Sequence, residues 1–127
     1  MDGIVRLGCE DPRCSRIVTF GGVTYLTGQT SDKGSRIKQQ TEIVLNKIDK
    51  LLAEAGTDKS QLLTAMIWLR NVQKDFVGMN EVWNKWIDGN NKPVRACVQS
   101  TLAREGLLVE IQVTAANPNA LTTKSSL

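Results

Sequence analysis

Two stretches of the chain repeat apolar residues at intervals of three and four, which predicts two amphipathic helices. The first predicted helix covers Gly34–Ala55, and Gly56 follows as a residue able to end it in a left-handed conformation. The second predicted helix covers Lys74–Ile87 and includes Trp83 and Trp86 in its apolar stripe. The apolar face of the first helix consists of Ile37, Val44, Leu45, Ile48, Leu51, Leu52 and Ala55.

Several shorter runs are rich in β-branched and aromatic residues or alternate between apolar and polar positions, which predicts strands. Gly21 and Gly22 separate two of these runs and predict a hairpin turn. Gly28, near the end of another, indicates a bulge or the close approach of a second group to the backbone. The predicted strands are Ile4–Cys9, Ser15–Phe20, Val23–Thr30, Leu62–Arg70, Pro93–Leu102 and Leu108–Val113.

The order of these elements predicts an α+β fold, a mixed β-sheet with two helices packed on one face. The other face of the sheet would carry Met66, Trp68 and β-branched residues, an apolar area larger than soluble monomers expose. We therefore expect a homo-oligomer. Residues 1–117 form one predicted domain, and residues 118–127, which lack periodicity, are predicted to be disordered.

The last two predicted strands each place a charged residue among apolar neighbours, Arg95 in the first and Glu110 in the second. An arginine and a carboxylate on neighbouring strands form either a structural ion pair or a polar site with an anion clamp and a proton carrier. If the strands pair antiparallel, Arg95, Cys97 and Glu110 share a face only when paired residue numbers sum to an odd number.

Composition narrows the classes of function. The 127 residues have a net charge of +3, with 16 basic and 13 acidic residues mixed along the chain, which argues against a nucleic-acid surface. The sequence shows neither an apolar run long enough to span a bilayer nor a secretory signal, so the expected location is cytoplasmic, without a membrane partner. The cysteines, Cys9, Cys14 and Cys97, are odd in number, and reduced thiols are the simpler interpretation.

The chain contains no histidine. This excludes a Ser-His-Asp or Cys-His arrangement, a two-histidine zinc site and a histidine general base. The cysteine spacing offers no zinc site, and neither a Walker loop nor a dinucleotide fingerprint is present. Any chemistry must use carboxylate, arginine, cysteine, lysine, tyrosine, backbone and water.

Other candidate residues have a structural and a functional interpretation. Cys97 is favoured as a lining residue over a nucleophile because no histidine activates it. Asn80 interrupts an aromatic helix stripe, and we favour satisfaction of a backbone group over contact with a site. Trp83 and Trp86 are favoured as core or subunit contacts over a substrate platform. Arg13 either closes over a site or is solvated.

Together these segments resemble the Rid family, the YjgF-like reactive intermediate deaminases, from about Ile4 to Asn117. Each segment alone is a weak signal, but five in this order and spacing are fairly specific. They are Leu26-Thr27-Gly28-Gln29, Leu51-Leu52-Ala53-Glu54-Ala55-Gly56, Met79-Asn80-Glu81-Val82-Trp83, Pro93-Val94-Arg95-Ala96-Cys97-Val98, and Val109-Glu110-Ile111 followed by Ala115-Ala116.

The resemblance implies a chorismate-mutase-like fold and a homotrimer whose clefts lie between subunits. It also implies cofactor-free hydrolysis of enamines or imines to 2-keto acids and ammonia, without a metal. In such proteins the residue matching Arg95 holds the substrate carboxylate, and the one matching Glu110 positions or activates water. Gly28 and Cys97 match positions that line the cleft, and Asn80 matches one that often borders it.

One departure from the family pattern concerns substrate choice. Prototypical deaminases carry a tyrosine in the loop before the second strand, where this chain has Arg13 and Cys14. Arg13 would change the charge and shape of the cleft, which suggests a subfamily whose substrate differs or whose imine activity is weak. The alternative function is a non-catalytic small-molecule-binding or chaperone-like trimer that uses the same clefts. A ribonuclease, a name attached to some relatives, has little support from the mixed charges and the missing histidine.

Overall fold

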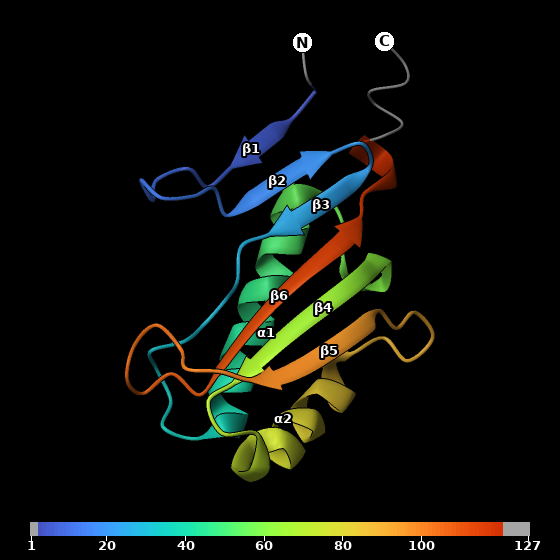
Figure 1. Ribbon diagram of the computed structural model, residues 1–127. Coiled ribbons are helices and arrows are strands. Elements are labelled where there is room, and N and C mark those ends of the chain that lie inside the picture. Colours follow the sequence, from blue (N-terminus) through green and yellow to red (C-terminus); the bar gives the residue numbers. More distant parts are fainter. Residues whose placement is uncertain (1–2, 121–127) are drawn as a thin grey trace.

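The computed structural model describes residues 3–120, which form a sheet with two long helices beside it (Figure 1). The predicted succession of strands and helices is confirmed, although each predicted element differs from the observed range by one to four residues at one end or both. In chain order the elements are β1 (Val5–Leu7), β2 (Ile17–Phe20), β3 (Val23–Leu26), α1 (Ile37–Ala55), the short 3-10 helix η1 (Lys59–Gln61), β4 (Leu62–Leu69), α2 (Val72–Trp86), β5 (Val94–Gln99) and β6 (Val109–Ala116).

The six strands form one mixed sheet in the order β1-β2-β3-β6-β4-β5. The strand pairs are antiparallel except β4 with β5, which run parallel because α2 carries the chain back across the sheet between them. The two strands that carry Arg95 and Glu110 are therefore not neighbours, since β4 lies between β5 and β6. The parity condition for a direct pairing of those strands does not apply.

Both helices pack on the same face of the sheet, as predicted (Figure 1). Along β6 every second residue is fully buried under α1, because alternate side chains of a strand point to the same face. α1 contributes the matching side of the core with its own apolar stripe. The core side chains with no exposed area include Val109, Ile111, Val113 and Ala115 of β6 and Val44, Ile48 and Leu52 of α1.

The helix ends follow local capping chemistry. α1 begins at Ile37, three residues later than predicted, because Arg36 is still extended with φ −124° and ψ 155°. It ends as predicted at Gly56, whose φ of 91° lies in the left-handed region and whose N–H donates to Ala53 O at 3.0 Å. α2 begins two residues earlier than predicted, because the Asn71 side chain accepts a hydrogen bond from Lys74 N.

The open face of the sheet is partly apolar. Tyr25 on β3 is 46% exposed, and on β5 Val94 is 72% and Val98 is 42% exposed. Polar side chains lie between them, including Thr64 and Thr114, whose hydroxyls are 2.7 Å apart across β4 and β6. The sequence-based expectation of a second copy on this face remains a prediction.

After β6 the described part of the chain continues to residue 120. Residues 118–120 form a helical turn in which Asn117 Oδ1 accepts a hydrogen bond from Ala120 N at 3.4 Å. The rest of the segment predicted to be disordered, residues 121–127, lies outside the described residues. Within residues 3–120, neither helix combines the length and apolar character needed to cross a membrane.

Candidate functional site

Arg95 is held at the edge strand β5 by two side chains of α2. Its Nη1 donates a hydrogen bond of 2.8 Å to Asn80 Oδ1. Its guanidinium carbon lies 5.2 Å from the centre of the Trp83 ring, within the range of a cation–π contact. Asn80 and Trp83 are three residues apart and therefore lie on one side of the helix. The residue stays exposed, and among residues 3–120 no carboxylate forms an ion pair with it.

Asn80 has a different role from the one favoured from the sequence, whereas Trp83 has the expected role and a second one. Asn80 was expected to satisfy a backbone group, but its amide oxygen instead accepts from the side chain of Arg95. Trp83 is a core residue, as expected, with 6% of its surface exposed, and it also places an aromatic face under the guanidinium. The spacing of positions 80, 83 and 95 holds no signal for this contact, because it depends on where α2 crosses the sheet.

Cys97 lies two residues beyond Arg95 on the same face of β5 and packs against the edge of the core. Burial raises the pKa of its thiol above the ordinary value, and the positive charge of Arg95 offsets only part of this effect. A thiol with a raised pKa is protonated at neutral pH and is a poor nucleophile. These properties support a lining role for Cys97 over a nucleophilic one.

Glu110 and Gly28 meet on the open side of the sheet. A Cβ built on Gly28 would collide with Glu110 Oε2 and would lie 3.1 Å from Glu110 Cδ. This is the close approach to the backbone that the glycine at this position predicted. Gln29, the next residue, is bound to Ile111 by two backbone hydrogen bonds of 2.9 and 3.1 Å, which fixes the segment beside β6.

The start of β6, which sets the position of Glu110, is fastened to α1 by a buried glutamine. Gln40 Nε2 donates to Gly34 O at 2.9 Å and to Gly106 O at 2.7 Å. Gln40 Oε1 accepts from Leu108 N at 2.8 Å. Since Gln40 is 1% exposed and its amide is fully engaged, the loop before β6 is held rigidly against the helix.

Arg95 and Glu110 lie on opposite faces of the sheet. In the register, Arg95 is opposite Ala65, which in turn is opposite the buried Val113, so Arg95 projects on the side of the helices. Glu110 is opposite Trp68 and projects on the open side. With β4 between their strands as well, the two side chains are kept apart within one chain.

Arg13 borders a pocket of ≈ 340 Å³ between the β1–β2 loop and residues 27–29. It makes a two-point ion pair with Asp11, with Nη2 to Oδ2 at 2.9 Å and Nε to Oδ1 at 3.0 Å. The hydrogen bond from Arg13 holds the pKa of the Asp11 carboxyl at about 2, so the pair is fully charged at neutral pH. Gly28 also lines this pocket. Gly28 therefore lies between Arg13, with which it shares this pocket, and Glu110, which it contacts, while Arg95, Asn80 and Cys97 lie in another region.

Residues 3–120 contain no group of three or more Cys, Asp or Glu side chains arranged to hold a metal ion. Cys9, Cys14 and Cys97 are all free thiols. The chemistry available in the two regions consists of a guanidinium, an amide and an indole in one, and of carboxylates, a guanidinium and backbone groups in the other.

Known proteins resemble this chain both in sequence and in fold. Residues 11–117 match the family model described as Endoribonuclease L-PSP. A RutC family protein of Haemophilus ducreyi is 41% identical over 105 residues, covering 82% of this chain and 89% of that protein. The RutC family protein YoaB of Escherichia coli is 35% identical over 113 residues, covering 89% and 97%. A crystal structure of a YjgF family member from Neisseria meningitidis has a TM-score of 0.86 and 40% identity, covering 90% and 94% of the two chains.

Proposed function

Because the chain belongs to the Rid family of YjgF and RutC proteins, we propose that it hydrolyses imines and enamines of small amino acids to 2-keto acids and ammonia. The observation that carries this proposal is the state of Arg95. Its guanidinium is exposed, is held by Asn80 and Trp83, and has no carboxylate partner among the described residues. A structural salt bridge, the main alternative for this arginine, is thereby disfavoured.

The contacts of Arg95 suit the binding of a carboxylate. Only one guanidinium nitrogen is used by Asn80, which leaves donors for two parallel hydrogen bonds to a substrate. The ring of Trp83 covers one face of the guanidinium, so an anion would approach in its plane. A free arginine side chain carries about 2 kcal/mol of rotamer entropy, and the two α2 contacts reduce what remains to be lost on binding.

In the proposed reaction Arg95 holds the carboxylate of a protonated imine and Glu110 orients a water molecule toward the imine carbon. The water oxygen forms a bond to that carbon while Glu110 accepts a proton from the water. The proton then passes to the amine nitrogen. As the C–N bond breaks, Glu110 takes the proton of the new hydroxyl group and later releases it to water, so the products are a 2-keto acid and ammonia. A positioned general base of this kind contributes ~10²–10⁴-fold to the rate.

The proposal requires a second copy of the chain. Arg95 and Glu110 project from opposite faces of one sheet, so they act on one substrate only if they come from different copies. We therefore propose a homotrimer in which Arg95, Asn80 and Cys97 of one subunit face Glu110, Gly28 and Arg13 of the next. Exposed valines on β5 and the open face of the sheet offer the apolar surface for such contacts.

Arg13 occupies the loop position at which prototypical deaminases carry a tyrosine. Since its charge is matched by Asp11, the pair adds bulk and polarity at the edge of the pocket without adding net charge. We propose that Arg13 contributes to substrate choice through the shape of this loop, and that the preferred substrate is a small imine with a single carboxylate.

A second candidate function is suggested by the separation of Arg95 from Glu110 within one chain. If the neighbouring copy does not bring Glu110 to the site, Arg95, held by Asn80 and Trp83, is still positioned to bind an anion. Such a protein would bind a 2-keto acid at Arg95 without hydrolysing any imine, as a small-molecule-binding or chaperone-like protein.

The test measures 2-keto acid formation from imines generated by an amino-acid oxidase, with and without the protein. The wild type is expected to accelerate hydrolysis, and Arg95→Ala to lower kcat/KM about 10- to 100-fold because two charge-assisted hydrogen bonds are lost. Arg36→Ala, at an exposed arginine before α1, is the matched control and should behave as wild type.

Two results would decide against this proposal. Equal rates for Arg95→Ala and wild type would show that Arg95 does not hold the substrate carboxylate during hydrolysis. Binding of a 2-keto acid that depends on Arg95, measured by calorimetry, without acceleration of any imine in a panel, would instead establish the non-catalytic function.

A further inference from the structure

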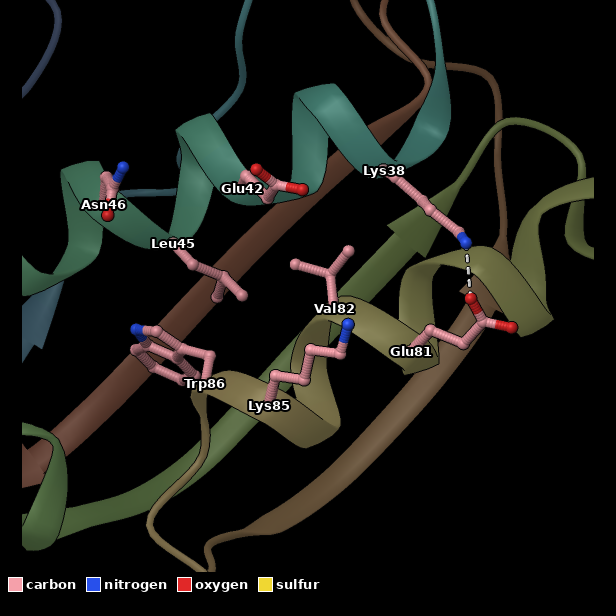
Figure 2. Close-up of a pocket in the computed structure, with 8 residues that line it drawn as sticks. All are labelled: Lys38, Glu42, Leu45, Asn46, Glu81, Val82, Lys85 and Trp86. Atoms are coloured by element: carbon pink, nitrogen blue, oxygen red, sulfur yellow. Dashed lines mark ion pairs between the residues drawn. The ribbon is translucent and has the colours of Figure 1, made fainter.

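A groove lies between α1 and α2 on the side of the helices that faces away from the sheet (Figure 2). It has a volume of ≈ 320 Å³, within the size range of small-molecule sites. None of the residues assigned to the proposed reaction lines it. Its lining consists of Lys38, Glu42, Leu45 and Asn46 of α1 and Glu81, Val82, Lys85 and Trp86 of α2.

The floor of the groove is apolar and rigid. Leu45 is 1% exposed, and Val82 and Trp86 pack against the core beside it. The Trp86 indole is fixed because its Nε1–H donates a 2.9 Å hydrogen bond to Asp49 Oδ2. An aliphatic or aromatic group placed here would meet three packed apolar side chains, one of them an aromatic ring.

The charges of the side chains around this floor sum to zero, but only two of the four charged residues form an ion pair with each other. Lys38 and Glu81 form an ion pair across one end of the groove, drawn as a dashed line in Figure 2. The hydrogen bond from Lys38, supported by the weaker charge effect of Lys85, holds the pKa of the Glu81 carboxyl below its ordinary value. Within residues 3–120, neither Glu42 nor Lys85 forms an ion pair of its own.

Glu42 and Lys85 therefore leave one anion and one cation on opposite walls of the groove. Figure 2 shows Lys85 rising from α2 beside Val82 toward the gap between the helices, and Glu42 on the facing helix α1. A ligand complementary to this arrangement is neutral overall, carries a separated positive and negative charge, and has an apolar group for the floor.

We propose that the groove binds a zwitterionic α-amino acid with an apolar side chain. Lys85 takes its carboxylate, Glu42 takes its ammonium group, and the side chain lies on Leu45, Val82 and Trp86. Because the charged groups are exposed to water, binding is weak, with a Kd on the order of 1 mM. This site is separate from Arg95 and does not depend on the proposed reaction.

The indole N–H of Trp86 can report binding in the groove by NMR. The chain has 3 tryptophans, so the indole N–H of Trp86 gives one of three such signals in a ¹⁵N-labelled sample, and Trp86→Phe assigns it. Titration of the full chain with L-leucine should move this signal along a saturable curve. N-acetyl-L-leucine lacks the ammonium group and L-leucinamide lacks the carboxylate, so each should bind about threefold to tenfold more weakly.

Charge-neutral variants test the two walls. Lys85→Gln and Glu42→Gln should each weaken L-leucine binding about threefold to tenfold. Lys50→Gln and Glu54→Gln remove the same charges from exposed positions of α1 outside the groove and should bind as wild type. All four residues are exposed, so thermal unfolding should confirm that each variant is folded.

Three results would overturn the proposal. The first is the absence of a saturable shift of the Trp86 signal up to about 50 mM L-leucine, far above the expected Kd. The second is equal binding of L-leucine and of the derivatives that lack one charge. The third is loss of binding in Arg95→Ala but not in Lys85→Gln or Glu42→Gln, which would assign the amino acid to the Arg95 site. Loss of imine hydrolysis in Arg95→Ala with L-leucine binding intact would leave both proposals standing.

Discussion

At the scale of single residues, the contact between Gly28 and Glu110 limits which side chains position 28 accepts. A Cβ there would overlap Glu110 Oε2 and press on Cδ and Cγ at 3.1 and 3.3 Å. Oε2 is the far end of a flexible side chain, so a methyl group would displace the carboxylate with little effect on the backbone. The φ of Gly28 lies outside the left-handed region, so an alanine adds no backbone strain.

Gly28→Ala should therefore separate the function of Glu110 from the stability of the fold. We expect the free energy of unfolding, measured by chemical denaturation, to change by less than about 1 kcal/mol. Imine hydrolysis should fall about 10-fold or more, because the water-orienting carboxylate is displaced from its place.

The matched control is Gly56→Ala. Gly56 has a φ of 91° and open space around its Cα, so alanine strains the backbone there by about 1–2 kcal/mol without touching Glu110. Activity per folded molecule should be kept in this control. A Gly28→Ala protein with full activity would show that the position of the Glu110 carboxylate does not matter for hydrolysis.

At the scale of elements, the sequence predicted the strands and helices better than it predicted their neighbours. Strand periodicity reports which residues share a face, but it contains no information on which strands pair. The segments carrying Arg95 and Glu110 adjoin in the sequence, yet β4 separates them in the sheet. The contact of Arg95 with Asn80 and Trp83 was missed for the same reason, since it arises only from the crossover of α2 over the parallel pair β4 and β5.

The early start of α2 was missed because its first turn contains Gln73 and Lys74, which interrupt the apolar period. Asn71 begins the helix by accepting a hydrogen bond from Lys74 N at 3.0 Å. Asn71→Ala should lower the free energy of unfolding by about 1 kcal/mol, measured by urea denaturation, because one backbone N–H of the first turn loses its partner.

Asn84→Ala provides the control on the same helix. Asn84 is exposed in the interior of α2, where alanine has the higher helix propensity, so this change should be neutral or stabilising by a few tenths of a kcal/mol. Equal destabilisation by both substitutions would contradict a capping role for Asn71.

At the scale of the whole molecule, two features favour the assembly of several copies: the open face of the sheet and the separation of Arg95 from Glu110 within one chain. A sheet with helices on one face leaves Tyr25, Val94 and Val98 exposed on the other. If the reacting groups come from two copies, loss of assembly removes activity without changing any residue of the site. Assembly and hydrolysis should then be lost together.

Val94→Asp tests this coupling. Val94 is 72% exposed on β5, so a carboxylate there is tolerated by the folded monomer but is costly in an apolar contact between copies. Light scattering after size-exclusion chromatography should give the wild type three times the 14.0 kDa mass of one chain. The mass of Val94→Asp should shift toward 14.0 kDa, and this variant should lose imine hydrolysis. Val77→Asp places the same charge at a 67% exposed valine on α2 and should keep both mass and activity. A monomeric wild type that hydrolyses imines would contradict a site shared between copies, because Arg95 and Glu110 of one chain face opposite sides of its sheet.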